Sequence, residues 1–228
     1  MTPARRAAKC FRDSRFLHGY AKGKAGWDPA YPAVAEILSR SSLPVLDIGC
    51  GVGLLAAYLR ESGCRQPLLG IEPDAEKVAL AAARVASAYP ALEFRTGDAR
   101  SLPEFSGDVV MLDVLHYMDP AAQVAVLQQI APRIAPGGSA LIRTTFRDRS
   151  WRYYATLFEE AIVRVTGWIR GGRCLFPTRE DVTDPFAGPE WDVHVRPMWG
   201  RTPFNSHLVE IRRKPAENPY PEPRNPTP

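Results

Sequence analysis

Short apolar runs alternate with amphipathic stretches through the middle of the chain, from about residue 44 to residue 145. Each apolar run is bounded by Gly, Pro or Asp, which indicates a buried strand. The runs cover residues 45–48, 68–71, 92–95, 109–112 and 140–143, and helical patterns cover residues 54–61, 75–88 and 121–134. Strands that alternate with helices of this length predict right-handed β-α-β units, a parallel sheet and therefore an α/β fold.

Helix ends are marked by capping residues. Asp74 and Asp119 precede two of the helical patterns as N-caps, and Pro120 suits the first helical position. The turn Pro136-Gly137-Gly138 closes the third helix. Further along, residues 192–198 and 206–213 alternate apolar and polar side chains, which predicts two more strands paired antiparallel.

Three segments flank this core. Residues 1–43 form an N-terminal cap with a Gly/Lys-containing stretch at 19–27 and an amphipathic helix at 32–38. Within the core domain of residues 44–214, residues 146–190 form a helical insert with a long helix at 151–169, a Gly-rich break at 171–172 and a short helix. Thr178 caps that helix, with Asp181 at its third position. The tail, 215–228, has six prolines in fourteen residues and is expected to be disordered.

Composition is that of an ordinary globular protein, with 45% hydrophobic and 24% charged residues among 228. No apolar run approaches the roughly 20 residues that cross a bilayer, and the N-terminus has no apolar signal-peptide core. Four cysteines without a C-x-x-C pair predict reduced thiols and a cytoplasmic location. The net charge of +4 comes from scattered arginines, which favours a solvated surface over a nucleic-acid footprint.

The first strand runs into a glycine loop, Asp47-x-Gly49-x-Gly51-x-Gly53. A dinucleotide fold instead has G-x-G-x-x-G here, so that a pyrophosphate rests on backbone N–H groups. In this chain an anion would meet Asp47. The loop therefore suits a cofactor with a cationic amino-acid end and no phosphate, such as S-adenosylmethionine.

Further acids end the next three strands. Glu72, Asp98 and Asp113 follow the second, third and fourth strands in turn, and all lie at the carboxyl edge where open α/β sheets bind ligands. Each acid alone is as readily a helix cap, a turn residue or half of a salt bridge. The ordered set on alternating strands indicates a cofactor site.

With these motifs in this order, residues 44–145 resemble the class I S-adenosylmethionine-dependent methyltransferases, which have a Rossmann-like fold. The resemblance implies a seven-stranded, mostly parallel sheet with helices on both faces and an antiparallel C-terminal strand. It also implies roles for site residues. Gly49, Gly51 and Gly53 line the methionine end, Glu72 takes the ribose, Asp98 and Ala99 contact the adenine, Asp113 and Leu115 close the pocket, and Tyr20 folds over the cofactor.

Methyl transfer is an in-line displacement, for which the protein supplies alignment, exclusion of water and, for some acceptors, a base. His116 lies just past the fourth strand and has a side chain suited to that task. Alternatively, His116 packs against the cofactor or bonds a backbone carbonyl. Tyr117 either shapes the acceptor site or packs under the next helix.

The acceptor is expected to be a small molecule, whether aromatic, polyketide-like or lipid-like. Trp151 and Tyr154 begin the long helix after the fifth strand and are candidates, with Tyr20, to wall an apolar pocket. Core packing produces the same aromatic stripe. Arg143 either pairs with an acidic acceptor or lies on the surface.

Other functions are less well matched. The segment after the fourth strand has no Asn/Asp-Pro-Pro-aromatic element of nucleic-acid amino methyltransferases. Asp113 stands without an obvious second carboxylate, since the fifth strand ends in Arg143-Thr144-Thr145, so no metal is predicted. A regulatory subunit that binds the cofactor without transfer remains an alternative, as does a macromolecular acceptor. A nicotinamide oxidoreductase would need glycines that face a phosphate. The oligomeric state is not predicted.

Overall fold

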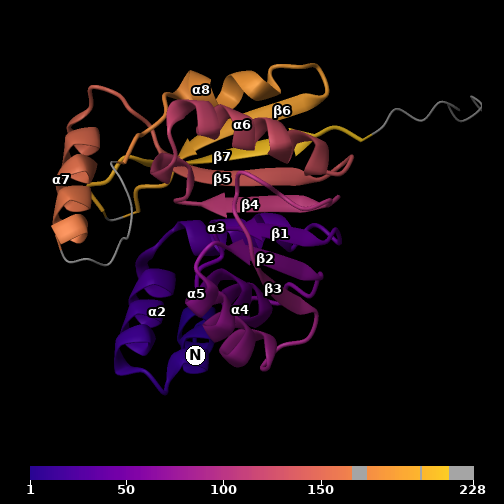
Figure 1. Ribbon diagram of the computed structural model, residues 1–228, viewed down its shortest axis with the longest axis vertical. Coiled ribbons are helices and arrows are strands. Elements are labelled where there is room, and N and C mark those ends of the chain that lie inside the picture. The colour runs from indigo at the N-terminus through magenta and orange to yellow at the C-terminus, as the bar shows by residue number, and fades with distance from the viewer. Residues whose placement is uncertain (166–173, 201, 216–228) are drawn as a thin grey trace, which may run out of the picture.

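A single seven-stranded sheet forms the centre of the molecule (Figure 1). The computed structural model describes residues 1–165, 174–200 and 202–215. The strand order is β3-β2-β1-β4-β5-β7-β6. The strands are β1 (Val45–Ile48), β2 (Leu68–Glu72), β3 (Leu92–Thr96), β4 (Asp108–Leu112), β5 (Ser139–Thr145), β6 (Trp191–Pro197) and β7 (Ser206–Arg213).

The topology places a ligand crevice between β1 and β4. Strands β1 to β5 pair in parallel, whereas β7 lies antiparallel between β5 and β6. Asp47 on β1 is in register with Gly70 on β2 and Val110 on β4. The chain winds outward from β1 through β2 to β3 and then returns to β4 on the other side of β1. Open α/β sheets bind ligands at the carboxyl side of such a switch point.

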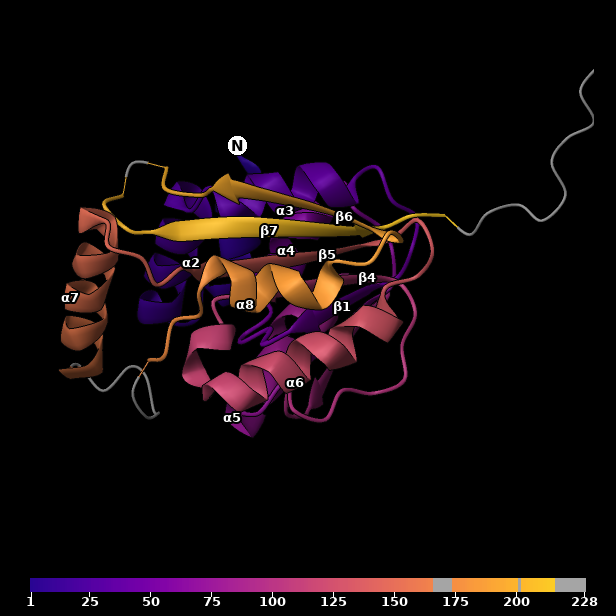
Figure 2. The ribbon, with the colours of Figure 1, turned by 90° about the horizontal axis from the view of Figure 1, so that it is seen from above.

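Helices cover both faces of the sheet (Figures 1 and 2). Val45 and Val110 point into one apolar cluster with α3 and α4, while Leu46 and Met111 point into a second with α6 and α8. The helices are α1 (Pro3–Ala7), α2 (Arg15–Trp27), α3 (Ala30–Leu38), α4 (Leu54–Glu61), α5 (Ala75–Ala81), α6 (Pro120–Ile130), α7 (Trp151–Val165) and α8 (Arg179–Thr183). Short 3₁₀ or π turns are η1 (Ala8–Phe11), η2 (Ala82–Ala86), η3 (Leu115–Tyr117), η4 (Ala131–Arg133) and η5 (Asp184–Phe186).

The fold class and sheet predicted from the sequence are confirmed, including the antiparallel strand pair. Asp74, Asp119 and Thr178 cap their helices as expected, and Thr178 forms a reciprocal capping box with Asp181. Two helices are shorter than predicted. The pattern at 121–134 ends as an α-helix at Ile130, because Pro132 has no N–H for the helical ladder. The pattern at 75–88 turns into a π turn after Ala81.

The N-terminal segment is more helical than its composition suggests. Glycines at 19, 23 and 26 disfavour a helix, yet α2 spans all three. Ser14 Oγ accepts the Leu17 N–H at 3.3 Å, and Ala21 and Ala25 are buried against neighbouring helices. Packing therefore outweighs propensity, and Phe11 joins the same apolar cluster as Leu59 of α4.

Two expectations fall partly or wholly outside the described residues. The long helix predicted at 151–169 is described as α7 to Val165, and the break at 171–172 lies beyond it. The tail is described only to Pro215, and the division into cap, domain and insert stays a prediction. Among the helices that are described, none combines the length and apolar character needed to cross a membrane.

Candidate cofactor site

The glycine loop between β1 and α4 is built from left-handed backbone. Gly49, Gly51 and Gly53 have φ values of 77°, 54° and 79°. A Cβ on Gly49 would lie 2.3 Å from Val114 Cγ2, and one on Gly53 would lie 2.9 Å from Phe94 Cζ. A Cβ on Gly51 would meet no atom within 4 Å. Packing therefore requires glycine at 49 and 53, whereas Gly51 faces open space.

Asp47 lies on β1, one residue before the strand ends and the loop begins. Asp47 is 3% exposed, and its Oδ2 has no hydrogen-bond partner among the described residues. Burial, and then the neighbouring Glu72 carboxylate, raise the pKa of Asp47 to about 7. A buried carboxylate oxygen that lacks a donor is costly, and a ligand ammonium group would satisfy it. The residues present thus fit the amino-acid end of S-adenosylmethionine.

Glu72 joins the end of β2 to the same loop. Its Oε2 accepts the Gly51 N–H at 3.0 Å, and its Oε1 accepts the Asp74 N–H at 3.3 Å. Its backbone carbonyl also accepts the Gly97 N–H from beyond β3 at 3.1 Å. The structure therefore gathers Asp47, the glycine loop and Glu72 at one carboxyl edge.

The residues expected at the adenine end make other contacts in this structure. Asp98 accepts the Arg100 backbone N–H at 2.8 Å and Nε–H at 2.9 Å. The Arg100 guanidinium holds the pKa of Asp98 below its usual value. Ala99 is buried in the apolar cluster that includes Ile71. The adenine contacts of Asp98 and Ala99 stay predictions.

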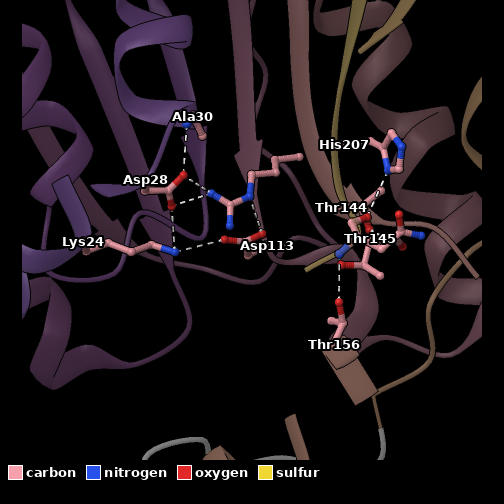
Figure 3. A network of polar contacts seen from close by, with 10 residues as sticks. Lys24, Asp28, Ala30, Asp113, Thr144, Thr145, Thr156 and His207 are labelled. Carbon is pink, nitrogen blue, oxygen red and sulfur yellow. Dashed lines mark hydrogen bonds and ion pairs between the residues drawn. The ribbon is translucent and has the colours of Figure 1, made fainter. Parts of the chain in front are cut away.

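Asp113 belongs to a ring of four alternating charges, shown in Figure 3. Lys24 Nζ lies 3.0 Å from Asp28 Oδ2 and 3.3 Å from Asp113 Oδ2. Arg143 Nε lies 3.0 Å from Asp113 Oδ1, and Arg143 Nη1 contacts both oxygens of Asp28. Burial raises the pKa of Asp113, but Arg143 and Lys24 outweigh it and hold that pKa below its usual value.

This ring bears on two sequence predictions. Arg143, a candidate partner for an acidic acceptor, has its guanidinium against Asp28 and Asp113 and is mostly buried. Tyr20 lies near the same charges, and its partial burial raises its pKa, with Lys24 opposing the shift and Asp113 adding to it. Asp28 and Lys24 were not recognised from the sequence, because nothing in their spacing connects them to residues 113 and 143.

The segment after β4 carries the candidate base. His116 is 5% exposed, and its ring lies 4.2 Å from that of Tyr117 and 5.1 Å from that of Phe176, centroid to centroid. Its carbonyl accepts the Leu175 N–H at 2.8 Å. Leu115, expected to close the cofactor pocket, is fully buried in the second apolar cluster, and its contact with the cofactor stays a prediction.

Comparison with known proteins shows what the central part of the chain is similar to. Residues 45–138 match the family model described as "Methyltransferase domain". A ubiquinone biosynthesis O-methyltransferase of Rhodopseudomonas palustris is 30% identical over 117 residues, covering 50% of this chain and 44% of that protein. Residues 45–138 thus match the methyltransferase family, and the chain is similar to the class I S-adenosylmethionine-dependent methyltransferases. A further relative with the same name, from Rhizobium rhizogenes, is 26% identical over 188 residues, or 79% of this chain and 71% of that protein.

Solved structures show that the chain has the fold of known methyltransferases. The magnesium protoporphyrin IX methyltransferase from Synechocystis, with bound S-adenosylhomocysteine, aligns with a TM-score of 0.65 and 19% identity over 92% of this chain and 93% of its own. The mitomycin 7-O-methyltransferase aligns with a TM-score of 0.67 and 18% identity over 93% and 61%. The chain spans less than half of the length of the first curated relatives that it matches.

Two helices of the chain expose aromatic side chains at the carboxyl end of the sheet. Trp151, Tyr154 and Phe158 lie at helical spacing on α7 and are 64%, 60% and 69% exposed. Phe16, Tyr20 and Trp27 are exposed on α2, also on one helical face. Both helices lie at the same end of the molecule in Figures 1 and 2. Of the candidates for the acceptor pocket, Trp151, Tyr154 and Tyr20 are thus exposed, and their contact with an acceptor stays a prediction.

Proposed function

We propose that the chain transfers the methyl group of S-adenosylmethionine to a small-molecule acceptor by in-line displacement. The observation that carries this proposal is the buried Asp47 carboxylate, whose Oδ2 lacks a donor among the described residues, beside a glycine loop with space at Gly51. A dinucleotide phosphate would be repelled at that position. An ammonium group would be held there.

In the proposed complex each strand end has one task. Asp47 holds the ammonium group, Glu72 accepts hydrogen bonds from the ribose hydroxyls, and Asp98 and Ala99 receive the adenine. Gly49, Gly51 and Gly53 let the backbone approach the amino-acid end, and Asp113 borders it. The sulfonium of the bound cofactor supplies an activated methyl group, while the protein's residues orient the acceptor and exclude water. No metal ion is part of the proposal, because β5 ends in Arg143-Thr144-Thr145 and offers no carboxylate there.

The proposed acceptor has an apolar or aromatic body and a hydroxyl oxygen. The exposed Trp151, Tyr154 and Tyr20 support the apolar body, because aromatic side chains line sites for such ligands. The names of the curated relatives, ubiquinone biosynthesis O-methyltransferases, support transfer to oxygen. Polyketide-like and lipid-like phenols both fall within this class. A cytoplasmic site of action is also proposed, in keeping with four cysteines that are all thiols rather than disulfides.

His116 is the proposed general base for such a hydroxyl, with Tyr117 beside it. We expect His116→Ala to lower kcat by about 100-fold or more and to remove the acidic limb of the pH–rate profile. Stopped assays of methyl transfer between pH 5.5 and 9 measure both effects. The matched control is His194→Ala, an exposed histidine on β6. A His116→Ala profile that keeps wild-type rates at every pH would assign His116 to packing alone.

The proposed function is tested by calorimetry of the chain with S-adenosylhomocysteine and, separately, with NAD. We expect binding of the former with a Kd in the micromolar range and none of the latter. Tight NAD binding would overturn the proposal. Transfer of a tritiated methyl group to a small-molecule extract then tests catalysis. Binding without transfer to any extract fraction would favour a regulatory subunit, and label in protein or nucleic acid would favour a macromolecular acceptor.

A further inference from the structure

The ring of Lys24, Asp28, Asp113 and Arg143 connects three parts of the chain that are distant in sequence. Lys24 lies on α2, and Asp28 is the first residue after that helix. Asp113 follows β4, and Arg143 is on β5. The charges alternate around the ring, two positive and two negative, so the ring is neutral as a whole and the loss of any single charge leaves a net charge. Arg143 contacts both Asp28 and Asp113, and Figure 3 shows Lys24 between the same two carboxylates.

The ring is built into the protein rather than spread over its surface. The side chains of Asp28 and Arg143 are almost buried, and those of Lys24 and Asp113 are about one-third exposed. Asp28 also accepts the Ala30 N–H at 3.0 Å, so the same carboxylate ties the end of α2 to the start of α3. A buried charge that loses one partner is left uncompensated, so neutralising a single member perturbs the others.

The ring reaches the glycine loop through Asp113. The Asp113 backbone is left-handed, with φ of 60°, and its N–H donates to the Arg143 carbonyl at 3.1 Å. Arg143 thus holds Asp113 by side chain and backbone together. The next residue, Val114, packs against Gly49. A Cβ added to Gly49 would lie 2.3 Å from Val114 Cγ2. A shift of Asp113 therefore moves the wall of the glycine loop.

We infer that Arg143 and Asp28 are positioning residues for methyl transfer: their ion pair fixes the Asp113–Val114 turn against Gly49 and draws α2, with Tyr20, over the same edge. This inference rests on the proposed function. It assigns Arg143 to the architecture of the cofactor site and not to recognition of an acidic acceptor. It also makes the N-terminal segment a part of that site.

The test is a double-mutant cycle on S-adenosylhomocysteine affinity with Asp28→Asn, Arg143→Gln and the combined variant. We expect each single change to weaken binding about tenfold, and the combined variant to weaken it no further than either single change, because the two act through one contact. Arg143→Lys keeps the positive charge, but a lysine ammonium lacks the planar guanidinium through which Arg143 contacts two carboxylates. It serves as the milder variant if Arg143→Gln does not fold, and an intermediate loss is expected.

The matched control is the exposed ion pair of α3, Glu36 with Arg40, at 2.7 Å. Glu36→Gln and Arg40→Gln are expected to leave affinity unchanged. Trypsin cleavage at Lys22 provides a second readout: bound S-adenosylhomocysteine should slow it in the wild-type chain and much less in Asp28→Asn.

Two outcomes distinguish failure of this inference from failure of the proposed function. Ring variants that unfold at lower temperature but bind S-adenosylhomocysteine like the wild-type chain would reduce the ring to a structural role and overturn the inference alone. A wild-type chain that binds no S-adenosylhomocysteine would overturn the proposed function, and the inference with it.

Discussion

At pH 8 the Asp47→Asn variant is expected to bind S-adenosylhomocysteine about 100-fold more weakly than the wild-type chain. The loss follows because a buried ammonium–carboxylate pair becomes a buried ammonium beside a neutral amide. The same substitution is expected to stabilise the ligand-free protein, by roughly 2–4 kcal/mol at pH 8, since it removes a carboxylate that burial holds away from water. Calorimetry measures the first effect and urea unfolding the second.

The pH dependence of Asp47 has a definite sign. Burial and Glu72 raise its pKa in the folded protein to about 7 from 3.8. A raised pKa means that the protonated form stabilises the fold: this contribution is complete below pH 3.8 and is lost as the pH rises through 7. The stability gap between Asp47→Asn and wild type should therefore shrink when the pH falls from 8 to 5.

Cofactor affinity should change in the opposite direction. Only the ionised carboxylate pairs with an ammonium group, so wild-type affinity for S-adenosylhomocysteine should rise between pH 6 and pH 8, while the Asp47→Asn affinity stays flat. Asp192→Asn, in an exposed part of β6, is the control and should match wild type in both measurements. Equal affinities of wild type and Asp47→Asn at pH 8 would remove the ammonium assignment.

Gly49→Ala and Gly51→Ala are expected to fail in different ways. The new Cβ at Gly49 meets Val114 at 2.3 Å on left-handed backbone, so Gly49→Ala should lower the free energy of unfolding by about 2–4 kcal/mol. At Gly51 the Cβ meets nothing within 4 Å, and only backbone strain of about 1 kcal/mol remains. Gly51→Ala should fold, yet bind S-adenosylhomocysteine at least about tenfold more weakly, because its methyl group enters the proposed ligand space.

Gly137→Ala is the matched control for Gly51→Ala. Gly137 also has a positive φ, 80°, and a Cβ added there would meet no atom within 4 Å, but it lies in the turn before β5. The two variants should lose similar stability in thermal unfolding, and only Gly51→Ala should lose ligand affinity. A Gly51→Ala protein with wild-type affinity would place the ligand away from the loop.

The sheet was predictable because each of its strands carries a local signal. The run at 45–48 is apolar apart from Asp47 and buried on both faces, as a central parallel strand requires. The antiparallel pair alternates instead, and β6 has one face in the core. Capping residues such as Asp74 and Thr178 marked helix starts correctly, since their effect needs only neighbouring backbone.

The charge ring and the helix α2 were not predictable in the same way. Lys24, Asp113 and Arg143 meet only because α2 packs across the strand ends, and no local spacing encodes that contact. Likewise, Phe176 reaches His116 from 60 residues further along the chain. The predicted acids at strand ends needed only the rule that parallel strands end at one edge, so Asp47 and Glu72 were found while their neighbours from other elements were missed.

The two outermost strands bear on how the protein behaves at high concentration. Both β3 and β6 have one side without a partner strand in the described sheet. Glu93 and Arg95 form an exposed ion pair on β3, while β6 exposes Asp192 and Arg196 and ends at Pro197. A foreign strand would have to strip water from these charges before it could add to the sheet. The margins of the sheet thus oppose amyloid-like growth, and they should keep crowded or slowly folding copies from aggregating through them.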